Sequence, residues 1–422
     1  MLDRKESPEL QEIHNIHFVE PIQRDLTQNT SLFLMDKVKD DTVRIEFHFN
    51  AGQISGKRNM ATFVSALLLS GTKDKTSEQI HEELDSLGAY IDQEISMESA
   101  FVNLYCLRQN VLQAFELLIS ALENVSFEEH EIEDMLQVKK QRYLVSLEKV
   151  SFLARKAFQK YFFSNLGSYS RQLELEDFDS VNREDLIDFH KEFYLKGLRK
   201  IVVVSNLQDE IVSAISERLK SWSQASISVF EGKLEHQKGS FHVEKKGAIQ
   251  TAIRLGIPLF NKKHEDYVKF QVLQTILGDY FGSRLMSNIR EDKGYTYGIG
   301  CGLVELKETG YFVIATEVGK DVCDATINEI KYEIERLRTE LVPHDELSLV
   351  KNYLLGQLLK SADGPNAMMD LFLGVRQHQM TLDFYNEYIE KIKAVTSEEL
   401  MEIAVKYLVF DNFTLVTAGE RN

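Results

Sequence analysis

The chain has 422 residues, of which 43% are hydrophobic and 27% are charged, with only 5 prolines. This length exceeds what one ordinary hydrophobic core serves and predicts more than one domain. The net charge of −17 excludes nucleic acid as an expected partner, because an acidic surface and a phosphate backbone repel each other. No stretch approaches the roughly 18 uncharged apolar residues that span a bilayer, so no membrane partner is expected either.

The N-terminal segment and the cysteines bear on the cellular compartment. The chain starts MLDRKESPELQEIHNIHF, which is charged and amphipathic and lacks the apolar core of a signal peptide. We therefore expect a cytoplasmic location. Cys106, Cys301 and Cys323 lie far apart without a C-x-x-C pair, which argues against a disulfide framework and a thiolate zinc site.

Hydrophobic periodicity divides the chain into groups of strands and helices. Runs of β-branched and aromatic residues predict strands, and longer amphipathic stretches predict helices. In chain order the expected elements are strand Thr42–Ala51, helix Glu128–Glu148, strand Arg199–Ser205, strand Ile249–Pro258, helix Pro343–Leu359 and strand Phe413–Ala418. Because strands and helices do not alternate strictly, we predict an α+β fold with mixed or antiparallel sheets and helices packed on one face.

The second part of the chain repeats the first. Val181–Asn206 aligns without gaps on Val395–Glu420, and each segment is a capped helix followed by a buried strand. Asn182 is the expected N-cap of the first helix, and Thr396 or Ser397 that of the second. Passages from strand to helix that lie upstream in the two parts also correspond, with nearly the same separation in residue number as these two segments. We therefore predict two tandem repeats of one α+β topology.

A change of composition marks the boundary between the repeats. Helical periodicity stops there, and glycine, serine and charged residues accumulate. We expect a first repeat at residues 1–225, a linker at 226–248 and a second repeat at 249–422.

Two segments of the first repeat carry a family resemblance. Ala61–Thr72 reads ATFVSALLLSGT, and Leu84–Ala89 reads LDSLGA. They resemble the first repeat of insulinase-type (pitrilysin-type) zinc metallopeptidases, which have a helix reading roughly A-H-F-L-E-H-M-L-F-K-G-T at this point. The resemblance covers nearly the whole chain. It implies a two-repeat insulinase-like fold and a relationship to zinc metalloendopeptidases.

Other residues occupy the zinc-binding positions of that motif. In H-x-x-E-H the two histidines share one helical face and bind the metal, and the glutamate acts as general base on a metal-bound water. Thr62, Ser65 and Ala66 stand at these positions, and none of them supplies an imidazole or a carboxylate. The family's third ligand is a glutamate on a later helix, and the corresponding stretch, residues 137–143, contains no carboxylate. We therefore expect a degenerate zinc site and no cofactor in this chain.

The second repeat contains a further motif at Leu277–Leu303, LGDYFGSRLMSNIREDKGYTYGIGCGL. It predicts a short helix at Ser283–Arg290, a turn, and a strand in which Tyr295 and Tyr297 share one face. The resemblance matches Arg290 and Tyr297 to an Arg/Tyr pair that active family members place opposite the zinc. A guanidinium and a phenol are donors that can hold a substrate carbonyl and stabilise a developing oxyanion. The alternative is structural, with a charge near a helix C-terminus and an ordinary strand residue.

The family includes bacterial two-chain enzymes in which one chain carries zinc and the other supplies the Arg/Tyr pair, and this sequence resembles the second kind. The resemblance implies a heterodimer with a homologous zinc-bearing chain, in which Arg290 and Tyr297 act in trans during endoproteolysis of unfolded peptides. Such peptides bind as an extra strand on a sheet edge, here expected near Gly88–Gln93. The alternative is a non-enzymatic structural or peptide-binding subunit of the same fold, so whether this chain acts as an enzyme stays open.

Overall fold

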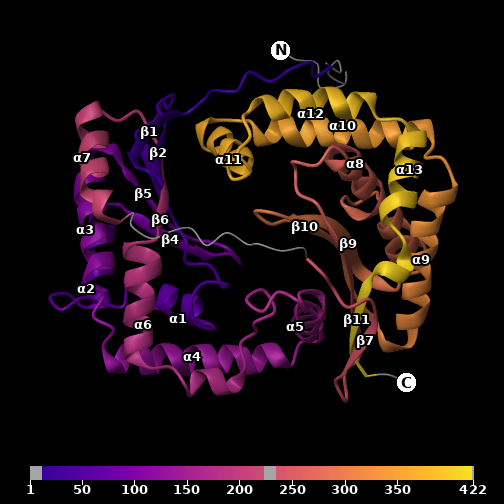
Figure 1. The fold of residues 1–422 in the computed structure, drawn as a ribbon, viewed down its shortest axis with the longest axis horizontal. Helices are drawn as coiled ribbons and strands as arrows, with labels where there is room; N and C mark the ends of the chain where they lie inside the picture. Colours follow the sequence, from indigo (N-terminus) through magenta and orange to yellow (C-terminus); the bar gives the residue numbers. More distant parts are fainter. Residues whose placement is uncertain (1–11, 223–233, 421–422) are drawn as a thin grey trace, which may run out of the picture.

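The structure is a computed structural model that describes residues 12–222 and 234–420. Two mixed sheets, each with its own set of helices on the outer face, stand opposite each other across the molecule (Figure 1). Within the described residues, no helix combines the length and apolar composition that a bilayer crossing requires.

The first sheet has six strands in the order β1-β2-β6-β3-β5-β4. Its strands are β1 (Ile22–Thr27), β2 (Thr30–Met35), β3 (Thr42–Phe49), β4 (Tyr90–Ile95), β5 (Ala100–Leu107) and β6 (Leu198–Val204). The pair β2–β6 is parallel, and all other neighbours are antiparallel. The edge strand β4 overlaps the segment near Gly88–Gln93 in which the sequence predicts a sheet edge.

The second sheet has five strands in the order β7-β11-β8-β10-β9. Its strands are β7 (Gly239–Glu244), β8 (Gln250–Leu259), β9 (Thr296–Glu305), β10 (Gly310–Gly319) and β11 (Thr414–Gly419). The pair β7–β11 is parallel and the others are antiparallel. Apart from β1 this is the order and the sense of the first sheet, so the predicted α+β duplication is confirmed.

The helices repeat in the same way. The first half contains α1 (Met60–Leu67), α2 (Ser77–Ser86), α3 (Val111–Glu123), α4 (Glu129–Leu147), α5 (Val150–Phe162), α6 (Arg183–Phe189) and α7 (Asp209–Leu219). The second half contains α8 (Tyr267–Gly278), α9 (Cys323–Thr339), α10 (His344–Ser361), α11 (Pro365–Arg376), α12 (Asp383–Ala394) and α13 (Ser397–Tyr407). Asn182 and Thr396 are the N-caps of α6 and α13, and each side chain accepts a bond from a backbone N–H of the first helical turn.

One part of the chain differs from its expected role. The predicted linker at 226–248 contains β7, which pairs in parallel with β11 along the edge of the second sheet. The strand escaped prediction because an edge strand needs little apolar character, and Gly239, Ser240 and Glu244 are exposed. Residues 226–233 lie outside the described residues.

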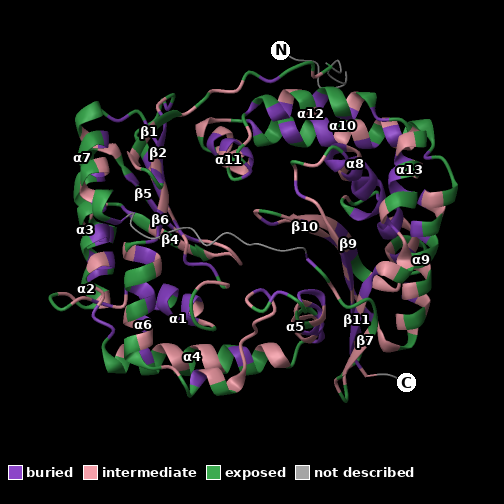
Figure 2. Ribbon diagram, in the orientation of Figure 1, coloured by how far each residue is buried: buried purple, intermediate pink, exposed green. Residues whose placement is uncertain are grey.

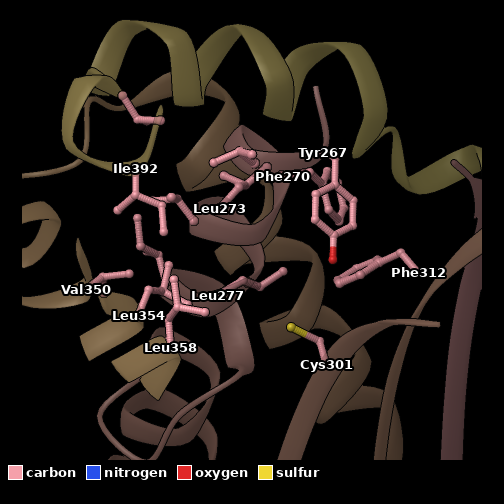
Figure 3. Close-up of a cluster of buried hydrophobic side chains, with 14 of the residues drawn as sticks. Tyr267, Phe270, Leu273, Leu277, Cys301, Phe312, Val350, Leu354, Leu358 and Ile392 are labelled. Carbon is pink, nitrogen blue, oxygen red and sulfur yellow. The ribbon is translucent and has the colours of Figure 1, made fainter. Parts of the chain in front are cut away.

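Each half has its own hydrophobic core between its sheet and its helices. In the second half α8 is buried along nearly its whole length, as Figure 2 shows. Its residues Phe270, Leu273 and Leu277 pack among Leu354 of α10 and Ile392 of α12 (Figure 3). Ten of the twelve residues of α8 are buried, because this helix contacts β9 as well as the outer helices α10, α12 and α13.

Two helices cross from one half to the other. Helix α5 belongs to the first half in sequence but packs on β8 and β11 of the second sheet (Figure 1). Its residues Phe158 and Phe162 are buried there. Its counterpart α11 packs against β6 of the first sheet, and Phe372 of α11 lies 5.1 Å from Phe33 of β2 between ring centroids. The inner face of each sheet is thus covered in part by a helix from the other repeat.

We expect Gly256→Ala in β8 to destabilise the protein, because this glycine lets α5 approach the sheet. A Cβ at Gly256 would lie 2.5 Å from the ring of Phe158 and 2.9 Å from the carbonyl oxygen of Phe312. Overpacking of this kind costs about 1–3 kcal/mol, measurable as a lower midpoint of urea unfolding. Gly302→Ala in β9 is the matched control, because a Cβ there meets no atom within 4 Å. Equal midpoints for the two variants would contradict the close packing of α5.

Candidate functional site

The Arg/Tyr motif lies where a helical turn leads into the edge strand of the second sheet. The turn, Met286–Asp292, is a π-helix that overlaps the predicted helix at Ser283–Arg290. The backbone N–H of Tyr295 donates to the carbonyl of Ile289 (3.0 Å), which fixes the direction in which β9 leaves the turn. Single π-helical turns are frequent at functional sites.

A β-bulge orients Tyr297 away from the core. Ile299 pairs with Thr316 and Thr296 with Val318, so Tyr297 and Gly298 together oppose a single residue of β10. The Thr296 hydroxyl lies 2.8 Å from the carbonyl oxygen of Glu317 and accepts the N–H of Gly298 (3.1 Å), which holds the bulge in place. A bulge re-aims the side chain it carries, and here the side chain of Tyr297 is 94% exposed.

The two predicted strand tyrosines have different surroundings. Tyr295 precedes β9 and packs partly against the core of the second half, whereas Tyr297 stands free at the bulge. The sequence predicted both tyrosines on one face, because side chains two residues apart point the same way in a regular strand. The extra residue of the bulge changes the alternation at this point.

Arg290 stacks on an exposed aromatic ring. Its guanidinium carbon lies 4.7 Å from the ring centroid of Phe281, whose side chain is 64% exposed. Such stacking orients a guanidinium and leaves its N–H donors available. In the described part of the chain, neither this guanidinium nor the Tyr297 hydroxyl has a hydrogen-bond or ion-pair partner. Both groups can therefore bind an acceptor from outside the chain.

Hollows flank the start of β9. One of about 560 Å³ is lined by Phe281 and by the glycine-rich run of β9 that starts at Gly298. Another of about 440 Å³ is lined by Tyr297 together with Arg254 and Glu317. Because Gly298 and Gly302 have open space where a side chain would be, the backbone of this edge strand is accessible to an extended chain.

The degenerate zinc positions lie on α1 and do not form a metal site. Thr62 is half-buried, Ala66 is exposed, and Ser65 is buried beside the phenol of Tyr194, whose pKa is raised by burial. A hydroxyl, a methyl group and a second hydroxyl offer none of the imidazole or carboxylate ligands that zinc takes in proteins. Among the described residues, no group of three or more His, Cys, Asp or Glu side chains is arranged to hold a metal ion. The residues present do not fit zinc.

A cavity of about 390 Å³ that the sequence does not predict adjoins Thr62, one of the degenerate positions. It is lined by Thr62 of α1, by Tyr143 of α4, and by side chains of α5 and of the second sheet. Its charged lining residues are all basic: Arg155, Lys156, Arg171 and Arg254. The one signal in the sequence was a lone arginine within the apolar run of β8, Thr251–Leu259.

Two protein-family models match the chain. The model described as insulinase (peptidase family M16) matches residues 32–166, and the model described as peptidase M16 inactive domain matches residues 180–354. The chain belongs to the insulinase family, M16. It is a member whose sequence contains no H-x-x-E-H motif.

Relatives within M16 are described in different ways. A protein of Rickettsia felis described as an uncharacterized zinc protease is 27% identical over 73% of this chain and 75% of its own length. The Bacillus subtilis protein YmxG, also described as an uncharacterized zinc protease, is 24% identical over 81% of this chain and 84% of its own. A Helicobacter pylori protein described as non-peptidase homolog YmxG is 26% identical over 88% of this chain and 87% of its own.

Solved structures share the fold. The peptidase M16 inactive domain from Pseudomonas fluorescens superposes with a TM-score of 0.85 at 18% identity, covering 96% of this chain and 99% of that one. A structure described as a protease from Helicobacter pylori gives a TM-score of 0.80 at 16% identity, covering 94% and 99%. These likenesses establish the M16 fold for both repeats.

We expect the chain purified without chelators to contain no stoichiometric zinc and to leave a generic unfolded peptide uncut. Neither Thr62 nor Ser65 can replace an imidazole or a carboxylate ligand, and the basic cavity beside them repels a divalent cation. Elemental analysis measures the metal content, and excess zinc should leave the thermal midpoint unchanged because only a bound ligand raises it. One tightly held zinc per chain would contradict this interpretation of α1.

Proposed function

We propose that this M16 chain is the partner subunit of a two-chain peptidase, in which a homologous chain holds the zinc and this chain supplies Arg290 and Tyr297. The proposal includes a cytoplasmic heterodimer built from four repeats, two per chain, with a first repeat at 1–225 and a second at 249–422. Peptide cleavage would occur at the partner's metal. This chain would hold the substrate carbonyl and stabilise the charge that develops on its oxygen.

The observation that carries the proposal is that, among the described residues, neither the Arg290 guanidinium nor the Tyr297 hydroxyl has a hydrogen-bond or ion-pair partner. A tyrosine that is 94% exposed at a bulge contributes little to the stability of its own chain. An arginine stacked on exposed Phe281 has free donors in a defined direction. Preorganised donors of this type stabilise an oxyanion without reorganisation during the reaction.

The open edge of the second sheet favours an unfolded peptide as the substrate. β9 has an open hydrogen-bonding side and glycines in place of side chains along its start. An extended peptide can add to such an edge through main-chain hydrogen bonds, which selects for an unfolded conformation more than for sequence. Tyr297 lies at the start of this edge and would contact the peptide there.

A second candidate function is a non-enzymatic peptide-binding or structural subunit. It is favoured by the Helicobacter pylori relative described as a non-peptidase homolog, which aligns over most of this chain. In that case the exposed edge strand and the two free donors would bind a peptide without any role in its cleavage.

We expect Tyr297→Phe, in the complex with the zinc-bearing chain that co-purifies, to lower kcat roughly ten- to a thousandfold, the scale of one oxyanion donor. The substitution removes one hydroxyl and keeps the ring, so assembly and zinc content should not change. Arg290→Ala should have a comparable effect and raise KM as well. If both donors serve one oxygen, the two losses should be non-additive.

The matched control is Tyr105→Phe on β5, which removes an exposed phenol from the first sheet, on the other half of the chain from the motif. It should leave kcat/KM at the wild-type value. Wild-type kcat/KM in the Arg290/Tyr297 double variant, with the complex intact, would refute the catalytic-partner role and leave the binding subunit as the function.

A further inference from the structure

The cavity beside the degenerate zinc positions lies between the two repeats. Its walls come from α1, α4 and α5 of the first half and from Arg254 of β8 and Tyr311 of β10 in the second sheet. At about 390 Å³ its volume is within the range of small-ligand sites. The cavity therefore depends on the crossing of α5 onto the second sheet.

The charge of the cavity is opposite to that of the chain. Four basic side chains line it and no carboxylate does, although the chain carries a net charge of −17. Lys156 is neutralised by Glu174 (2.5 Å) and also donates to the phenol of Tyr143 (2.6 Å). Arg171 donates to the carbonyl oxygen of Gly56 (2.6 Å), which leaves its charge uncompensated.

The remaining two arginines have no anionic partner among the described residues. The Arg254 guanidinium lies 5.3 Å from the ring centroid of Phe158, and its buried Nε has no acceptor. Arg155 packs over Phe152 at 5.4 Å and makes no ion pair within the described chain. Arg155 is exposed and Arg254 is half-buried, but buried polar atoms are normally hydrogen-bonded, so the unpaired Nε of Arg254 beside a cavity indicates space for an acceptor.

The two arginines also act on each other. Burial lowers the pKa of the Arg254 guanidinium from its usual value, Tyr311 raises it, and the positive charge of Arg155 lowers it further. Like charges that face one space repel each other, and an anion between them removes that repulsion. The guanidinium group matches carboxylate and phosphate oxygens in geometry, with two parallel N–H donors.

We propose that this cavity is an oxyanion-binding site in which Arg254 and Arg155 hold a carboxylate or phosphate group, with the aromatic rings of Phe158 and Tyr311 beside it. The site adjoins α1 through Thr62. The sign of its charge favours an anion. It involves neither Arg290 nor Tyr297 and requires no partner chain. Arg254 also lines the hollow beside Tyr297, whereas Arg155 does not, so a variant of Arg155 tests the cavity apart from the proposed peptidase role.

Isothermal titration of the full chain tests the site with three probes at low salt. They are inorganic phosphate, a short unstructured peptide with a free C-terminal carboxylate, and the same peptide with a C-terminal amide. Binding of the free-acid peptide but not of the amide identifies the peptide carboxylate as the ligand group, and binding of phosphate alone identifies a phosphate ligand. For whichever probe binds, Arg254→Gln and Arg155→Gln should each weaken affinity about tenfold, the scale of one charge-assisted hydrogen bond.

Lys160→Gln is the matched control, because Lys160 lies on the same helix, does not line the cavity and changes the net charge equally. It should leave affinity within about twofold of wild type, the scatter expected for a distant surface charge. Arg155 is exposed, so its variant should fold even if circular dichroism shows that Arg254→Gln does not, and Arg254→Lys then serves as the second variant. Absence of binding by any probe, or an equal loss in Lys160→Gln, would overturn the proposal.

Discussion

The reciprocal crossing of α5 and α11 is the interaction on which the rest of the structure depends. Each sheet packs its own helices on one face and receives a helix from the other repeat on the opposite face. Phe158 and Phe162 of α5 complete an apolar cluster with Ala252 and Val416 of the second sheet. Because neither sheet covers its inner face alone, the two repeats need each other to bury that surface.

The two repeats also contact each other through equivalent turns. Glu98, between β4 and β5, accepts the backbone N–H of Lys307, between β9 and β10 (3.0 Å), and also the hydroxyl of Tyr169 (2.7 Å). Equivalent turns of the two repeats thus meet each other. Where α11 meets the first sheet, Arg44 of β3 pairs with Asp370 of α11 (2.8 Å) and also with Glu46. Burial alone would raise the pKa of Glu46, but His48 and Arg44 lower it to about 2. Those polar contacts that join the two repeats lie outside the lining of the basic cavity, and they add directional links to the apolar clusters.

The sequence predicted what depends on local pattern and on self-similarity. The alignment of Val181–Asn206 with Val395–Glu420 was sufficient to predict the shared topology, because apolar periodicity and caps are encoded within each segment. The edge strand β7 escaped because its residues are largely polar. The bulge at Tyr297 escaped because its register is decided by hydrogen bonds to β10, and no pattern within β9 reports them. The basic cavity could not be predicted from any single segment, because Arg155 and Arg254 come together only when the two repeats pack.

The two candidate sites differ in how the chain supports them. The basic cavity lies between the two repeats, and three of its four basic residues lie on α5 and β8, elements that the fold needs for other purposes. The Arg/Tyr motif is external, and the stability of the fold gains little from a free guanidinium and a free phenol. The bulge that exposes Tyr297 is nevertheless fixed by the Thr296 hydroxyl and by a shift of register in the sheet. The backbone that carries Tyr297 is thus fixed although its own chain gains little from the side chain, and the open edge of β9 beside it has the hydrogen-bonding geometry that an extended backbone can match.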